Sequence, residues 1–232
     1  MNIPMKVAAN FTGPATEIAG IFEEDTGHRP VLSFGSTGDF KTQILNGAPF
    51  EILLAADSNT PLELEEGGFA VPGTRFTYAR GALVLWSASP GYVDPEGEVL
   101  KRNGFRRLAA ANPEVAPYGA AAHEFLRNWG LLPALEPKIV TGNSVSDAFQ
   151  AVASGNAELG LVAWSQVCKG GRLASGSVFK VPAGLYGPIL QDAVLLKGGS
   201  GSDGAKAFLS YLKTSPKARE IIVSYGYGLP GE

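Results

Sequence analysis

Four short turns hold the residues of this sequence that are best suited to bind a ligand. Each joins a predicted strand to a predicted helix, is rich in small residues and lacks lysine and arginine. The turns are NFTG (Asn10 to Gly13), GSTG (Gly35 to Gly38), PYGA (Pro117 to Ala120) and NSVS (Asn143 to Ser146). The first turn of a helix presents unpaired backbone N–H groups, which bind anions. The turns predict either ordinary helix caps or, if they face one cleft, an anion site.

An anion site of this kind would contain only neutral donors. A helix terminus offers an anion about 0.3–1 kcal/mol, and a hydrogen bond to a charged group contributes about 1.5–3 kcal/mol. Six or seven such bonds give about 10–20 kcal/mol gross, against a desolvation cost of several kcal/mol per ion. Neutral dipoles can select an anion by its size and hold a fully deprotonated oxyanion. Asp39 and Asp147, in the first turns of their helices, are interpreted as dipole partners and not as ligand groups.

Strands and helices alternate along the chain and would position these turns. In the first helix, Ala15, Ile18, Ala19 and Phe22 recur with helical spacing before Gly27. Such alternation is typical of an α/β fold with mixed sheets and helices on both faces. We expect two lobes with a ligand cleft between them and two crossovers, near residues 80 and 190. Lobe 1 would comprise residues 1–80 plus 192–232, and lobe 2 residues 81–191. The predicted strands are 6–9, 30–34, 51–56, 82–87, 107–111, 138–141, 159–164 and 191–196, and the predicted helices 15–27, 37–46, 120–129, 145–154, 205–212 and 216–224.

Composition narrows the classes of function. The chain has 232 residues, a formal net charge of -3 and a pI near 5.5, which argues against nucleic acid or anionic membrane partners. No apolar run approaches the roughly 18 residues of a membrane span, so no membrane insertion is expected. The start MNIPMK lacks the features of a signal peptide, so we expect a cytoplasmic protein or a mature form with a supplied methionine. The lone Cys168 is interpreted as a small packed residue.

Catalysis finds little support in the sequence. The two histidines, His28 and His123, belong to no recognisable Ser-His-Asp arrangement, and the common hydrolase, zinc-protease and Walker motifs are absent. The acidic stretch DPEGE (Asp94 to Glu98) lacks the ligand spacing of a calcium loop. Trp86 and Trp164 fall in apolar strands and are predicted to be core residues. We expect no catalytic residue, no cofactor and no metal ion bound directly by side chains.

Eight short stretches, spread over nearly the whole chain, resemble one family in collinear order. This family is the periplasmic molybdate-binding proteins of ABC importers. The stretches are VAANFTGP (7–14), TGH (26–28), FGSTG (34–38), NGAPFE (46–51), AAD (55–57), PGTRFTY (72–78), NPEVAPYG (112–119) and SGNAELGLVA (154–163).

The resemblance implies a type II periplasmic-binding-protein fold that closes on a tetrahedral molybdate or tungstate ion. It also implies a mature periplasmic protein that acts as a monomer and delivers its ligand to an ABC permease. Residues matching the family's ligand set are Asn10, Ser36, Tyr118 and Val145, and Ala9, Thr12, Thr37 and Ser144 are further candidates.

Within this ligand set, Ser36 would give a hydroxyl and an amide, and Tyr118 and Val145 would give amides. Two positions depart from the family pattern. Asn10 stands where many members have serine, so its donor would be the side-chain or backbone amide. Ala163 stands where some members place a tyrosine that reaches the ligand, which leaves the number of donors open.

Two alternatives remain open at this stage. One is a sulfate or phosphate solute-binding protein; a protonated phosphate would call for an acceptor carboxylate in the site. The other is an enzyme that holds a phosphorylated small molecule at the same helix ends, which would require a titratable acid or base in the cleft.

Overall fold

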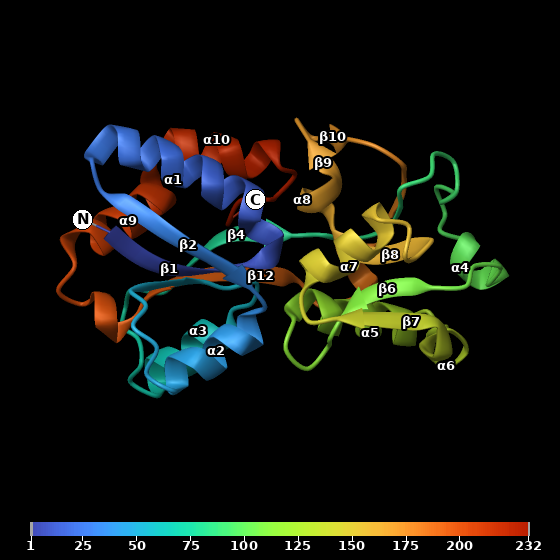
Figure 1. Cartoon of the computed structure of the whole chain (residues 1–232), viewed down its shortest axis with the longest axis horizontal. Helices are drawn as coiled ribbons and strands as arrows, with labels where there is room; N and C mark the ends of the chain where they lie inside the picture. Colours follow the sequence, from blue (N-terminus) through green and yellow to red (C-terminus); the bar gives the residue numbers. More distant parts are fainter. Residues whose placement is uncertain (1, 232) are drawn as a thin grey trace.

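The computed structural model describes residues 2–231, which form two five-stranded mixed sheets, one in each half of the molecule (Figure 1). This arrangement confirms the predicted α/β class. The first sheet has the order β2 (Arg29–Gly35), β1 (Asn2–Ala8), β3 (Ile52–Leu54), β12 (Ile189–Leu195) and β4 (Phe76–Gly81). The second has the order β11 (Ser177–Lys180), β5 (Leu83–Ser87), β8 (Leu159–Ala163), β6 (Leu108–Ala111) and β7 (Ile139–Gly142). A two-stranded hairpin joins β9 (Cys168–Lys169) to β10 (Arg172–Leu173).

Helices cover both faces of the first sheet and pack against the second (Figure 1). In the first half these are α1 (Thr12–Thr26), α2 (Thr37–Leu45), α3 (Asn59–Glu66), α9 (Asp203–Thr214) and α10 (Pro216–Ser224). In the second half they are α4 (Val99–Arg102), α5 (Pro117–Asn128), α6 (Leu132–Leu135), α7 (Val145–Ala153) and α8 (Trp164–Val167). Short 3-10 turns are η1 (Ala9–Phe11), η2 (Glu136–Lys138), η3 (Ala183–Leu185) and η4 (Lys197–Gly199).

The apolar pattern of the sequence explains these layers. Successive residues of β3 point to opposite faces, so Ile52 and Leu54 join the core beneath α1, α9 and α10, whereas Leu53 joins the core beneath α2 and α3. The predicted first helix is confirmed as α1, whose apolar stripe is buried. Gly27 ends it in the left-handed conformation at φ 73°, where glycine carries no steric penalty.

The chain passes between the halves at two places. β4 ends at Gly81 and β5 begins at Leu83, which carries the chain into the second sheet. It returns through β12, which starts opposite Gly81 and runs antiparallel between β3 and β4. The closing residues Tyr227 and Leu229 are buried in the core of the first half. We propose that each sheet with its helices forms one lobe.

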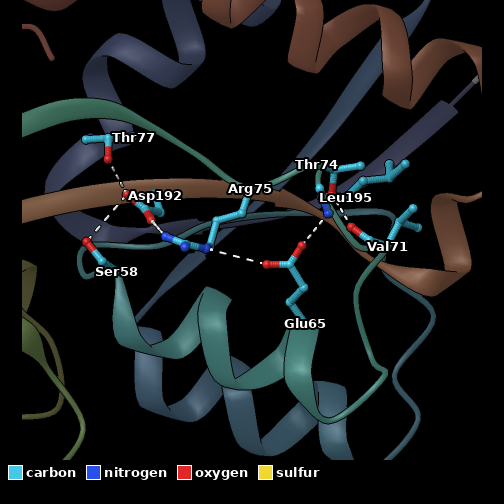
Figure 2. A network of polar contacts seen from close by, with 9 residues as sticks. Ser58, Glu65, Val71, Thr74, Arg75, Thr77, Asp192 and Leu195 are labelled. Atoms are coloured by element: carbon cyan, nitrogen blue, oxygen red, sulfur yellow. Dashed lines mark hydrogen bonds and ion pairs between the residues drawn. The ribbon is translucent and has the colours of Figure 1, made fainter.

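A buried carboxylate holds β12 at the second of these passages (Figure 2). Asp192 is fully buried and follows a register shift between β12 and β4. It accepts hydrogen bonds from Arg75 Nη1 at 2.6 Å, Thr77 Oγ1 at 2.7 Å and Ser58 Oγ at 3.4 Å. Glu65 on α3 lies 3.6 Å from Arg75 Nε. Because a buried charge is costly without partners, this network favours one position of β12 at this passage.

Some elements differ from the predictions. The third strand has only three residues, and α3, which begins at Asn59, is not among the predicted helices. Strand β11 and the β9–β10 hairpin were not predicted. The predicted core positions Trp86, Trp164 and Cys168 are buried. None of the helices within residues 2–231 combines the length and the apolar composition of a membrane span.

Candidate functional site

The four turns singled out in the sequence contribute to one cavity at the junction of the two halves. Two of the contributing segments follow β1 and β2 in the first half, and two begin α5 and α7 in the second. This arrangement places the carboxyl ends of strands from both sheets around one space, as is usual for ligand sites in α/β folds. The cavity is small, with a volume of about 10 Å³. Its lining consists of Ala8, Ala9, Asn10, Gly35, Ser36, Thr37, Ala56, Ala116, Pro117, Tyr118, Ser144 and Val145.

Two helix starts in this lining have no side-chain cap. The residues before η1 and α5 are Ala8 and Ala116, and neither makes a capping hydrogen bond. Pro117 has no N–H, so the first free donor of α5 is the backbone N–H of Tyr118. In η1 the corresponding donors are those of Ala9 and Asn10. These uncapped ends offer N–H groups to a ligand.

The other two helix starts are capped by serines that also line the cavity. Ser36 Oγ accepts from the Asp39 N–H at 3.3 Å and donates to Asp39 Oδ2 at 2.6 Å. Ser144 Oγ bonds to Asp147 in the same way, and Asp147 also accepts from the Ser144 N–H, which completes a capping box. The two aspartates therefore serve the helix ends, as predicted. For Ser36 to donate its hydroxyl to a ligand, the hydroxyl must turn away from Asp39.

The side chain of Asn10 is already bound to the protein. Its Nδ2 donates to Gln191 Oε1 at 2.5 Å and to Tyr227 Oη at 2.8 Å, which uses both of its hydrogens. The Asn10 carbonyl accepts from Tyr227 Oη at 2.7 Å and from Ser165 Oγ at 2.9 Å. Of the two donors considered for Asn10, the backbone N–H is thus the one that remains available.

The lining of the cavity carries no charged side chain. Burial raises the pKa of the Tyr118 and Tyr227 hydroxyls well above the ordinary tyrosine value, so both stay protonated. None of the residues that line the cavity is Asp, Glu, Lys, Arg or His. Among residues 2–231, no group of three or more His, Cys, Asp or Glu side chains could hold a metal ion. The arrangement can bind a small anion through dipoles, without a counter-charge.

A larger groove of about 500 Å³ adjoins the cavity between the halves. The two share Ala56, Ala116 and Pro117. The charged groups of the groove include Asp57, whose pKa is raised by burial, and Lys41, which pairs with Glu63. Charge thus lies in the groove and not in the cavity itself.

Seven of the eight predicted site residues line the cavity. They are Ala9, Asn10, Ser36, Thr37, Tyr118, Ser144 and Val145. Thr12 is not among them, because its hydroxyl donates to the Ala9 carbonyl at 2.8 Å within the start of α1. Ala163 is fully buried and also lies outside the lining.

Sequence reasoning missed the apolar part of the lining. Ala8, Gly35, Ala56, Ala116 and Pro117 complete the cavity wall. Three of these, Ala8, Gly35 and Pro117, stand directly beside a predicted site residue. Their place at a strand end or a helix start was the available signal, but small apolar residues carry no chemical mark of a site.

Comparison with known proteins places this geometry in a family. The family model described as "Bacterial extracellular solute-binding protein" matches residues 4–228. The chain belongs to this family of solute-binding proteins. Its curated relatives include a molybdate-binding protein, ModA, of Azotobacter vinelandii, 57% identical over 227 residues that span 98% of this chain and 90% of the relative. Another ModA, from Rhodobacter capsulatus, is 54% identical over 95% of this chain and 86% of the relative.

A solved structure supports the same assignment for this solute-binding protein. The periplasmic molybdate-binding protein of Azotobacter vinelandii superposes with a TM-score of 0.95 at 45% identity, covering 98% of this chain and 99% of that chain. The fold is thus that of periplasmic binding proteins, as the resemblance implied.

Proposed function

We propose that this protein binds a tetrahedral oxyanion, molybdate or tungstate, in the cavity between its lobes and delivers it to an ABC permease. The observation that carries the proposal is the pair of uncapped helix starts, one from each half, that meet in a cavity without charged side chains. The identity of 57% to a molybdate-binding protein supports the same ligand class. The protein acts as a binding component of transport and not as an enzyme.

We propose four backbone N–H groups as the main donors, those of Asn10, Ser36, Tyr118 and Val145. The N–H groups of Ala9, Thr37 and Ser144 lie in the same lining and are secondary candidates. Four hydrogen bonds to a charged ligand give about 6–12 kcal/mol gross. A dissociation constant of 1 μM corresponds to about 8 kcal/mol, so further donors and water exclusion by lobe closure are needed for tight binding.

The alternative ligands fit less well. A protonated phosphate needs an acceptor carboxylate, and none of the cavity-lining residues has one. An enzyme acting on a phosphorylated molecule needs an acid or base beside the substrate, and the same lining offers none. Sulfate carries the same charge as molybdate but is smaller, so the size of the ion separates these two ligands.

Calorimetric titration with sodium molybdate, tungstate, sulfate and phosphate tests the proposal. We expect molybdate and tungstate to bind at least about a hundredfold more tightly than sulfate, because donors fixed by helix ends cannot close around a smaller ion. Tighter binding of sulfate or phosphate would contradict it, as would absence of binding by all four ions.

Location and partners follow from the same proposal. We propose that the protein works in the periplasm, like the Azotobacter vinelandii protein of the solved structure. Its partner would be a permease that recognises the ligand-closed form, since closure is the ligand-dependent change in such a protein. We also predict a monomer, which sedimentation with and without molybdate can test.

A further inference from the structure

Beyond the ligand site, the start of α2 touches the opposite lobe at one backbone position. Gly38 lies two residues after Ser36, in the first turn of α2, where the helix leaves N–H groups unpaired. Gly38 does not line the ligand cavity. Its N–H donates to the Val115 carbonyl at 2.8 Å. Val115 belongs to the loop before α5, three residues ahead of Tyr118. The contact therefore joins the ligand-binding turn of one lobe to that of the other.

This contact leaves no room for a side chain at residue 38. A Cβ atom there would lie 2.8 Å from both the Cα and the carbonyl oxygen of Val115, and 3.1 Å from its Cβ. Two of these three atoms are backbone, so a rotamer change cannot relieve the overlap. Within its own lobe, Gly38 occupies an ordinary helical position, where alanine is the more favourable residue. The need for glycine thus arises only when the lobes are closed.

The acceptor side of the contact is held in place. The Asn112 carbonyl accepts from the N–H groups of Val115 at 3.4 Å and Ala116 at 2.9 Å, and Asn112 Oδ1 accepts from the Glu114 N–H at 2.9 Å. The Asn112 N–H itself donates to the carbonyl of Gly142, the last residue of β7, at 2.7 Å. A loop fixed in this way presents the Val115 carbonyl at a defined position.

Other bonds also join the lobes. One is a backbone bond away from the ligand-binding turns, from the Gly171 N–H to the Ser224 carbonyl at 3.1 Å. Two involve hydroxyl groups beside these turns. Ser146 Oγ donates to the Ala9 carbonyl at 3.3 Å, and Ser165 Oγ donates to the Asn10 carbonyl at 2.9 Å. Hydroxyls rotate and can bond to water when the lobes separate. The Gly38–Val115 bond has fixed backbone geometry at both ends, so it defines the closed position of the ligand-binding turns more strictly than these two hydroxyl bonds do.

We propose that Gly38 is a positioning residue for oxyanion binding: its bare backbone docks on Val115 and fixes the closed arrangement of the ligand donors. This inference rests on the proposed function. Gly38 makes no contact with the ligand and acts through the placement of Ser36 and Tyr118. In the GSTG turn, Gly35, Ser36 and Thr37 line the ligand cavity, whereas Gly38 faces the opposite lobe.

Titration of the Gly38→Ala variant with sodium molybdate tests the proposal. We expect binding at least about tenfold weaker than in the wild-type protein, from loss of one hydrogen bond and from the overlap with Val115. The melting temperature without ligand should stay equal or rise, because alanine suits the helix in the open form. X-ray scattering should show a smaller ligand-induced decrease in radius of gyration than in the wild-type protein. Gly20→Ala is the matched control, since Gly20 lies on the exposed side of α1 with no atom within 4 Å of its added Cβ.

Each outcome bears on the proposal. Affinity within twofold of the wild-type value would overturn it, and so would a ligand-free melting temperature below that of the wild-type protein, since alanine would then not fit lobe 1. Equal loss of affinity in Gly20→Ala would also overturn it. Failure of the wild-type protein to bind molybdate or tungstate would instead reject the proposed function.

Discussion

Replacing Ser36 by alanine should affect stability and ligand binding by separate amounts. The hydroxyl caps α2 by accepting from the Asp39 N–H at 3.3 Å, and loss of such a cap costs about 1 kcal/mol. In a chain of this size, that loss lowers the melting temperature by about 2–4 °C. If the hydroxyl also donates to the bound oxyanion, its removal costs about 1.5–3 kcal/mol of binding free energy. The dissociation constant for molybdate should then rise by about 10- to 150-fold.

A second serine cap provides the control for this prediction. Ser202 Oγ accepts from the Ala205 N–H at 3.2 Å at the start of α9, and Ser202 is buried to a similar degree but does not line the cavity. Ser202→Ala should lower the melting temperature by a similar amount and leave the affinity for molybdate unchanged. The reasoning is refuted if Ser36→Ala binds molybdate as tightly as the wild-type protein in calorimetric titration. It is also refuted if both variants lose affinity equally, because the effect would then come from stability alone.

Three further variants test the buried polar groups. Tyr227→Phe removes a hydroxyl that bonds to Asn10 at 2.7 and 2.8 Å, and it should lower the free energy of unfolding in urea by about 1–3 kcal/mol because a buried amide loses a partner. Asp192→Asn weakens the bond to Arg75, whose side chain is 32% exposed, and should cost about 2 kcal/mol in the same measurement. Burial raises the pKa of Asp57, so the native protein holds this proton to a higher pH than the unfolded chain does. Ionisation of Asp57 therefore lowers stability as the pH rises from the ordinary to the raised pKa, and Asp57→Asn should flatten this decline in urea unfolding measured between about pH 4 and 7.

These variants have simple controls. Tyr92→Phe changes an exposed tyrosine and should leave the free energy of unfolding nearly unchanged. Asp25→Asn breaks an exposed ion pair with Lys217, and its effect should be much smaller than that of Asp192→Asn. If a buried variant and its control unfold at the same urea concentration, the assigned contact contributes little. If Asp57→Asn and the wild-type protein show parallel pH profiles, Asp57 does not cause the decline.

The sequence predicts elements well where the apolar pattern is regular. α1 combines a helical stripe with a terminal glycine, and α10 begins at Pro216 and ends at Ser224, both as predicted. α3 was missed because only Thr60, Pro61 and Leu64 of its eight residues are buried, which leaves no apolar stripe in the sequence. Strand β11 was missed because its pairing with β5 is a long-range contact, which local sequence does not record.

For the site, the sequence indicates which turns matter but not where each side chain points. The position of Ser36 at the start of a helix follows from its neighbours, whereas the turn of its hydroxyl toward Asp39 does not. The Asn10 side chain binds Gln191 and Tyr227, which are 181 and 217 residues away along the chain. No local pattern links these residues. The choice between side-chain and backbone donors at Asn10 therefore depends on tertiary structure.

The path of β12 between β3 and β4 orders the assembly of the molecule during synthesis. All five strands of the second sheet lie within residues 83–180, so this sheet has its full set of strands before β12 leaves the ribosome. β4 lies at the edge of the first sheet and joins it through β12, so it must wait for residues 189–195. The half that contains the chain's beginning is thus the half that is completed last. A nascent chain arrested before residue 189 would have one finished sheet and one whose edge strand has no place to attach.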